Sequence, residues 1–141
     1  MKAFRIAAIV SLALLAAAFA GGEAWSPDAF RDERTLDFLT IGRGEGAHWS
    51  RVWLVVIDEQ LYVRLGSQAA GRIEDNTAAP YVQVKIAGRK LDRVRVEPAP
   101  EMAAKVAEAM AEKYWSDAFA RLFPHPLTAR LRPEPRGAAA P

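Results

Sequence analysis

Two stretches of the chain carry the alternation of apolar and polar residues that predicts β-hairpins. Residues 51–57 are apolar on both faces, which indicates a central strand, and residues 61–65 alternate immediately after a short polar turn. Residues 81–86 and 89–97 alternate in the same way on either side of an Ala-Gly turn. Each pair of segments is close enough in sequence to fold back on itself, so the pattern predicts two antiparallel hairpins.

Two further strands and two helices complete the predicted elements. Residues 36–41 form a lead strand before the first hairpin, and residues 127–132 alternate as a last strand. A short helix is expected over 26–34, because its Ser-Pro-Asp start supplies a capping side chain, a first-turn proline and a favourable negative charge. A long helix is expected over 101–115, where apolar residues recur at helical spacing: Met102, Val106, Ala109 and Met110.

The order of these elements predicts a mainly β fold with added helices. A six-stranded sheet that closes on itself, with the long helix plugging one end, fits this order best. Between the two hairpins, residues 66–80 break the pattern, with one helical turn expected at 72–76. We therefore expect a barrel domain over 36–133, preceded by an extension with the short helix at 21–35 and followed by a disordered tail at 134–141.

The first 20 residues have the layout of a secretory signal peptide. Lys2 and Arg5 give a positive start, an uninterrupted apolar run of 15 residues follows, and the run ends in an A-x-A cleavage signal at Ala20. A membrane-spanning helix usually needs about 20 residues, so cleavage is favoured over an uncleaved anchor. The mature protein is therefore expected to be exported, periplasmic or secreted, with a membrane contact only if the leader is retained.

Charge and cysteine content exclude several classes of function. The chain holds 19 Lys and Arg against 17 Asp and Glu, and the leader contributes two of the bases and no acid, so the mature part has 17 of each sign. This balance gives no electrostatic reason to expect a nucleic-acid partner. The absence of cysteine excludes disulfides and thiolate chemistry, so the exported domain must be stable through packing.

No motif in the chain identifies a catalytic reaction. The glycine-rich segment 42–46 has the spacing G-x-G-x-G and leads into a strand rather than a helix, which excludes a dinucleotide-binding turn. It is either a plain loop or a loop whose amides and Arg43 contact a phosphate. His48 and His125 have no metal-ligand spacing, and no Ser-His-Asp set is indicated, so no catalytic or metal-binding residue is predicted.

An aromatic cluster surrounds the first hairpin, and two interpretations of it stay open. Trp49, Trp53 and Tyr62 lie in or beside its strands, and Arg64 lies next to them. Aromatic side chains at such positions can be core residues. They can equally wall a cleft for a flat ligand, with Arg64 pairing an anionic group of that ligand.

Residues 53–64 (WLVVIDEQLYVR) match the pattern W-x-V-x-x-x-x-x-L-Y-V-R. This block resembles the signature of an uncharacterised bacterial family that is similar to the FMN-binding split barrels, the group of pyridoxamine-phosphate-oxidase-like proteins and deazaflavin-dependent reductases. Residues 40–43 resemble the T-x-G-R turn of the deazaflavin branch. The resemblance covers nearly all of the mature chain. It implies a six-stranded split barrel that forms a homodimer, with any cofactor at the dimer interface and its phosphate held by basic side chains.

The resemblance also implies positions for a cofactor site, whose occupant stays unidentified: FMN or another flat, anionic, flavin-like molecule. Arg43 matches the turn arginine, Arg51 the basic residue opening the second strand, and Arg64 the third-strand arginine. Arg72 matches the basic position after the loop that follows the third strand. Together with the two aromatic residues of the hairpin, the predicted cofactor-binding residues are Arg43, Arg51, Trp53, Tyr62, Arg64 and Arg72. No catalytic residue is named, because in such enzymes the flavin carries the chemistry.

The chain departs from the family's pattern at several charged positions. Gly44 and Glu45 stand where relatives often have Lys and Ser, and Glu74 and Asp75 stand where an aromatic and a basic residue are expected. Each lost charge-assisted contact is worth about 1.5–3 kcal/mol, so two losses would weaken a flavin phosphate site by orders of magnitude. The favoured function is therefore a non-catalytic ligand-binding or interaction module of the cell envelope. The alternative is a flavin-, deazaflavin- or haem-dependent oxidoreductase with its cofactor at a homodimer interface.

Overall fold

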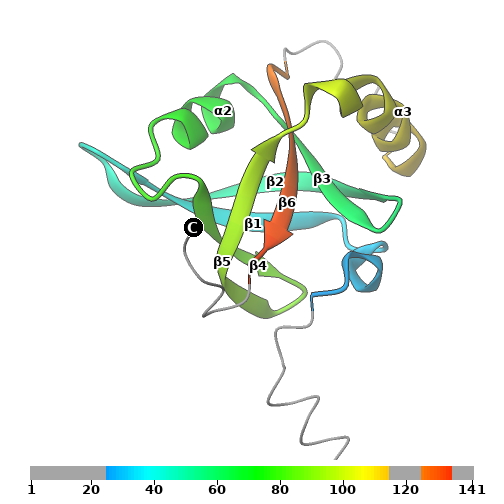
Figure 1. The fold of residues 1–141 in the computed structure, drawn as a ribbon, viewed down its shortest axis with the longest axis horizontal. Coiled ribbons are helices and arrows are strands. Elements are labelled where there is room, and N and C mark those ends of the chain that lie inside the picture. The colour runs from blue at the N-terminus through cyan, green and yellow to red at the C-terminus, as the bar shows by residue number, and fades with distance from the viewer. Residues whose placement is uncertain (1–24, 115–124, 135–141) are drawn as a thin grey trace, which may run out of the picture.

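A computed structural model describes residues 25–114 and 125–134, and within them six antiparallel strands close into a barrel. The strand order is β1-β2-β3-β6-β5-β4, with β4 paired back to β1 (Figure 1). The strands are β1 (Thr35–Gly42), β2 (Gly46–Ile57), β3 (Gln60–Leu65), β4 (Tyr81–Ile86), β5 (Arg89–Pro98) and β6 (Leu127–Pro133). The mainly β barrel predicted from the sequence is confirmed. The predicted signal peptide and the tail beyond Glu134 lie outside the described residues.

Among the described residues, four helical segments accompany the strands: the 3-10 turns η1 (Pro27–Phe30) and η2 (Pro100–Met102), and the helices α2 (Ser67–Glu74) and α3 (Ala103–Lys113). The helix expected over 26–34 is a single 3-10 turn, and the long helix opens with η2 rather than with an α-helical turn. The helical turn expected at 72–76 belongs to a longer helix, α2, which begins several residues earlier.

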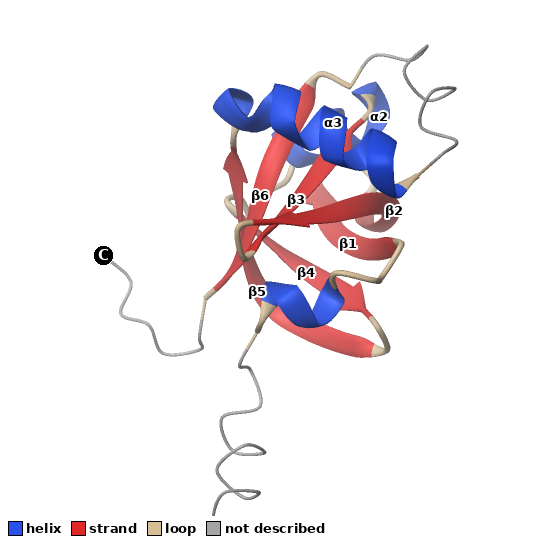
Figure 2. Ribbon diagram, turned by 90° about the vertical axis from the view of Figure 1, so that its right-hand side faces the viewer, coloured by secondary structure: helices blue, strands red, loops and turns tan. Residues whose placement is uncertain are grey.

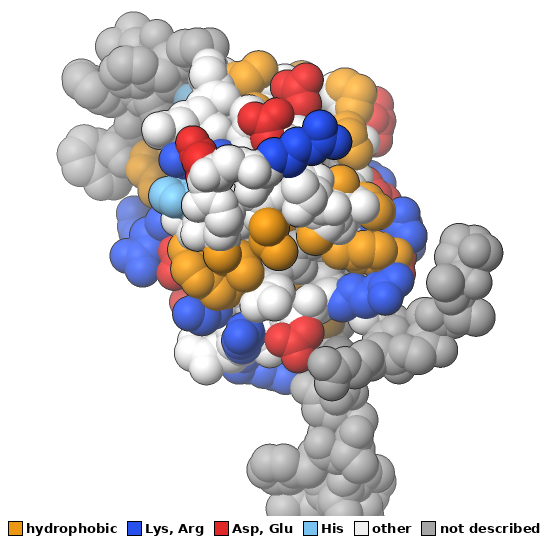
Figure 3. Space-filling model, turned by 90° about the vertical axis from the view of Figure 1, so that its left-hand side faces the viewer, with side chains coloured by type: hydrophobic (Ala, Val, Ile, Leu, Met, Phe, Trp, Pro, Cys, Tyr) orange, Lys and Arg blue, Asp and Glu red, His pale blue; other side chains and the backbone are white. Residues whose placement is uncertain are grey.

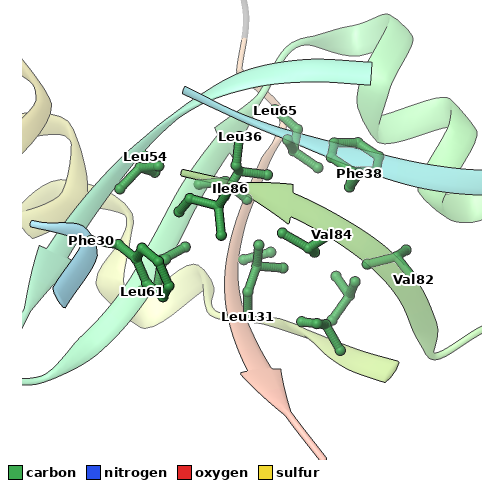
Figure 4. Close-up of a cluster of buried hydrophobic side chains, with 14 of the residues drawn as sticks. Phe30, Leu36, Phe38, Leu54, Leu61, Leu65, Val82, Val84, Ile86 and Leu131 are labelled. Atoms are coloured by element: carbon green, nitrogen blue, oxygen red, sulfur yellow. The ribbon is translucent and has the colours of Figure 1, made fainter. Parts of the chain in front are cut away.

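The barrel interior is filled by side chains that alternate along every strand. Leu36 pairs with Val52 and Phe38 with Ser50 in the β1–β2 ladder, and Phe38 pairs with Val84 in the β1–β4 ladder. Figure 4 shows the buried side chains of the strands converging on one another. Fully burying one such apolar side chain stabilises the folded state by about 1.5–3 kcal/mol. Because packed side chains occupy the interior, the barrel offers a ligand its rim and its outer faces.

The long helix lies on the outside of the barrel, which corrects the prediction that it plugs one end. Leu54 and Val56 of β2 belong to the interior cluster, so Val55 between them points outward, where it packs with Val106 and Met110 of α3. Figure 2 shows α3 lying across the barrel wall. The apolar stripe was correctly predicted, but helical spacing alone cannot say which sheet face it covers.

The ends of the barrel are closed by other elements. Ala69, Ala70 and Ile73 of α2 pack against the interior cluster, and so do Phe30 of η1 and the adjacent Trp25. The rings of Phe30 and Trp25 lie 5.1 Å apart. Figure 1 shows α2 and η1 far apart on the barrel. The packing of α2 explains why a segment with a weak helical signal forms a helix.

Tyr114, at the carboxyl end of α3, anchors the helix to the barrel. Its side chain is fully buried, and its ring stacks on Trp53 with centroids 4.6 Å apart. Its hydroxyl lies 2.6 Å from the carbonyl oxygen of Leu54 and 2.7 Å from that of Arg34, and burial raises its pKa. The neighbouring Lys113 ammonium donates to the same Leu54 carbonyl (3.1 Å), and burial lowers the pKa of Lys113.

The β2–β3 turn uses residues poorly suited to its backbone, which gives a first prediction. Asp58 and Glu59 have φ values of 49° and 63°, the left-handed conformation of a two-residue hairpin turn that favours Asn-Gly. Glu59→Gly is expected to stabilise the protein by about 0.5–1 kcal/mol, measured by urea unfolding. Gly88→Ala is the matched control, because Gly88 has a φ of 75° and its substitution should destabilise. An unchanged urea midpoint for Glu59→Gly would show that the left-handed backbone at Glu59 does not destabilise the protein.

Candidate functional site

A cavity of about 590 Å³ lies at the rim of the barrel, between the β1–β2 hairpin and the segment that runs from α2 into β4. In Figure 1 this hairpin projects beyond the barrel next to α2. The ionisable side chains that line the cavity are Arg43, Glu45, His48, Arg72, Glu74 and Asp75. The remaining lining residues are glycine, threonine and asparagine.

The hairpin wall of the cavity is built by its glycines. Gly42 pairs with Gly46 across a three-residue turn, and Gly46 takes a positive φ of 70°, which returns the chain into β2. This turn places Arg43 and Glu45 at the tip of the hairpin. Further along the ladder, His48 pairs with the buried Thr40, so both residues face the same side of the hairpin.

The opposite wall is held in place by the buried Asn76. Its Oδ1 accepts hydrogen bonds from the amides of Ile41 (3.1 Å) and Ala78 (3.2 Å), and its Nδ2 donates to the carbonyl of Tyr81 (2.9 Å). The amide of Thr77 adds a bond to the carbonyl of Ile41 (2.8 Å). The two bonds to Ile41 tie the loop after α2 to β1, and the bonds to Ala78 and Tyr81 fix the shape of that loop, so the cavity has two fixed walls.

The charged side chains of the cavity are not paired with one another. Within 25–114 and 125–134, no ion pair or side-chain hydrogen bond involves Arg43, Arg72 or the three carboxylates, and the buried Nε of Arg72 has no hydrogen-bond partner. Elsewhere on the barrel charges do pair, as Arg95 does with Glu134. Figure 3 views the molecule from the side of α2 and shows acidic and basic side chains close to a histidine. The cavity therefore offers polar groups to a ligand.

Of the six predicted cofactor-binding residues, the structure brings only Arg43 and Arg72 together at this cavity. Arg51 is exposed on the outer face, and its Nε donates to Asp37 (2.9 Å). The guanidinium of Arg64 lies 3.4 Å from Nδ1 of His125.

The two predicted aromatic residues lie beneath α3. Trp53 stacks on Tyr114, and Tyr62 is buried with its hydroxyl accepting a hydrogen bond from Arg130 (2.9 Å). Both side chains belong to the cluster that joins α3 to the outer face of β2 and β3. They therefore pack within the protein, away from the charged cavity.

Asn76 is the site residue that the sequence analysis missed. An available signal was its position before a turn, because an asparagine side chain often bonds the backbone amide two residues later. The bond from the Ala78 amide to Asn76 is of this kind. Nothing local in the sequence indicates the longer-range bond to Ile41.

The cavity does not fit a flavin ring or a porphyrin. Sites for such flat molecules are lined mainly by apolar and aromatic side chains, whereas among the described residues only His48 contributes a ring to the lining of this cavity. In the part of the chain that the structure describes, no set of three His, Asp or Glu side chains is arranged to hold a metal ion. No helix of this part is long and apolar enough to cross a membrane.

Comparisons with known proteins place the chain in a fold class. No family model matches the sequence, and no curated protein matches it. The closed six-stranded barrel with its flanking helices has the split-barrel fold, which it shares with solved structures. The resemblance drawn from the sequence is therefore confirmed at the level of the fold.

Three solved structures illustrate the similarity. HutZ of Vibrio cholerae, described as a heme storage protein, superposes with a TM-score of 0.59 at 19% identity, over 77% of this chain and 88% of HutZ. An F420-H2-dependent reductase, FDR-A, gives 0.53 at 13% identity, over 71% and 94% of the two chains. A protein described as a domain-swapped dimer gives 0.53 at 11% identity, over 94% and 99%. At these identities the likeness concerns the fold.

Proposed function

We propose that this protein is an exported, non-catalytic split-barrel module of the cell envelope that binds a small charged ligand at the rim cavity. The observation that carries the proposal is the position of Arg43 and Arg72, which line one cavity without a charged partner among the described residues. An unpartnered, buried guanidinium nitrogen is costly unless something binds it. An anionic group bound there would supply the missing acceptor.

Two observations favour a module over an enzyme. Glu45, Glu74 and Asp75 line the cavity, and the phosphate of a flavin would leave these three carboxylates without a positive group to balance them. The family resemblance implies that Trp53 and Tyr62 lie near a cofactor. Instead, both pack in the cluster beneath α3, and the Tyr62 hydroxyl accepts a hydrogen bond from Arg130.

The binding proposal predicts a ligand-dependent stabilisation that requires Arg72. A ligand at ten times its Kd adds about 1.4 kcal/mol, which raises Tm by about 5 °C in a domain of this size. Inorganic phosphate, titrated at constant ionic strength into the chain from residue 21 onward, should raise Tm in the native protein and not in Arg72→Gln. Arg51→Gln is the matched control, because Arg51 lies on the outer face, and it should respond like the native protein. An equal rise in Tm for all three proteins would show that phosphate does not bind in the rim cavity.

A second candidate function is an oxidoreductase with a flavin, a deazaflavin or haem at a homodimer interface. The named fold neighbours favour it, since one is a heme storage protein, one uses F420-H2 and one forms a dimer.

The visible spectrum of protein purified from its native compartment separates the candidates. A stoichiometric chromophore, retained less well by Arg64→Ala, would support the oxidoreductase. A colourless protein that fails to bind added FMN or haem would support the module, and its hydrodynamic mass would test the dimer.

Export is part of the proposal and has its own test. The positive start and apolar run of residues 1–20 support it. Expressed with its leader in a bacterium that secretes proteins, the mature protein should begin at Gly21 by intact mass. A full-length mass in the membrane fraction would instead indicate an anchor.

A further inference from the structure

The rim cavity presents both signs of charge on each of its walls. The hairpin tip contributes Arg43 and Glu45. The carboxyl end of α2 contributes Arg72, Glu74 and Asp75. Two guanidinium groups and three carboxylates thus face one space. A ligand that is only anionic would satisfy the arginines and be repelled by the acids.

The opposite charges of this cavity do not neutralise one another. Among the described residues none of these five groups takes part in an ion pair, although exposed arginines elsewhere find carboxylates, as Arg51 finds Asp37. The walls are fixed by the Gly42–Gly46 turn and by the bonds of Asn76, so the backbone positions that carry these groups are held on opposite sides of the cavity. A bridging ligand can therefore contact both signs.

The lining also restricts the ligand to a polar molecule. It consists of glycine, threonine, asparagine, histidine and charged residues, with no aliphatic side chain. Its volume of about 590 Å³ is within the usual range for small-molecule sites, roughly 300–1,000 Å³.

We propose, on the basis of the function proposed above, that the cavity takes a zwitterionic ligand that carries a phosphate and a primary ammonium. The phosphate pairs with Arg43 and Arg72, because the planar guanidinium group matches the geometry of a phosphate. The ammonium donates hydrogen bonds to Glu74 and Asp75. Phosphoethanolamine is the smallest probe with both groups.

The test compares three probes by calorimetric titration of the chain from residue 21 onward: phosphoethanolamine, inorganic phosphate and ethanolamine. Phosphoethanolamine is expected to bind at least tenfold more tightly than either single-charge probe. In the double variant Glu74→Gln/Asp75→Asn this preference over phosphate should disappear, while phosphate binds as well as before or better. Both substituted residues are exposed, so the variant should fold, which circular dichroism checks. The matched control is Asp58→Asn/Glu59→Gln, an exposed acidic pair at the other hairpin, which should keep the preference.

The outcomes separate this inference from the function on which it rests. If phosphate binds as tightly as phosphoethanolamine and Arg72→Gln abolishes both, the cavity is an anion site and the zwitterion inference is overturned while the binding function stands. If no probe binds in the millimolar range, both are overturned.

The same chemistry occurs in a free metabolite and in a lipid head group, and vesicles distinguish the two sources. Co-sedimentation with phosphatidylethanolamine vesicles, and not with phosphatidylcholine vesicles, supports the inference with a membrane source, because a quaternary ammonium has no hydrogen to donate. Binding of the free probe without co-sedimentation supports it with a soluble source. Equal co-sedimentation with both lipids would contradict the role of the ammonium.

Discussion

Tyr114→Ala is expected to lower the free energy of unfolding by about 3–5 kcal/mol, the usual loss when a buried aromatic side chain is removed. The substitution empties the space beneath α3, removes the ring that stacks on Trp53 and leaves the carbonyl of Leu54 without the tyrosine hydroxyl. The free energy of unfolding of a natural domain is only about 5–15 kcal/mol, so this loss is a large share of the total. Urea unfolding followed by circular dichroism measures the loss.

Two further variants show which part of Tyr114 matters. Tyr114→Phe keeps the ring and loses only the hydroxyl bonds, so its cost should be about 1–2 kcal/mol. Glu108→Ala changes an exposed position of the same helix and should stay within about 0.5 kcal/mol of the native protein. A loss below about 1 kcal/mol for Tyr114→Ala would mean that α3 is not held to the barrel by this residue.

Asn76→Ala is expected to cost about 2–4 kcal/mol and to abolish ligand binding at the rim. The side chain makes three hydrogen bonds, and each net bond is worth about 1 kcal/mol, with an added cost for groups left unsatisfied. Without these bonds only the backbone bond from the Thr77 amide ties the loop after α2 to Ile41, so one wall of the cavity loses its fixed shape. Unfolding by urea and titration with phosphoethanolamine measure the two effects.

Asn76→Asp is the matched control for this prediction. A carboxylate keeps the acceptor for the amides of Ile41 and Ala78 but cannot donate to the carbonyl of Tyr81 unless it is protonated. Its destabilisation should therefore be smaller at pH 4 than at pH 7, measured as the difference from the native protein at each pH. An Asn76→Ala protein with native stability and native ligand binding would show that the loop is held by other contacts.

The strands of this barrel were predictable because their signal is local. Alternation at 61–65 and 81–86 depends only on neighbouring residues, and the register that closes the barrel keeps those same residues inside. The helix α2 was less predictable because Gly71 weakens its pattern, and Ile73 meets the barrel interior only after folding.

The candidate site was predicted in part, for a related reason. The family resemblance pointed to Arg43 and Arg72, which are 29 positions apart, and both line the cavity. The stacking of Trp53 on Tyr114 joins residues 61 positions apart, and no periodicity could show that a helix covers this aromatic side chain. The position of α3 thus decides which outer residues remain available.

The filled interior of the barrel has a consequence for how such a protein can diverge. Its stability is concentrated in the strands and beneath α3, whereas the charges of the rim belong to a hairpin tip and to the segment after α2. Substitutions at Arg43, Glu45 or Glu74 would therefore alter selectivity at little thermodynamic cost. Homologues are expected to vary most in these two loops, and one scaffold can thereby serve different solutes.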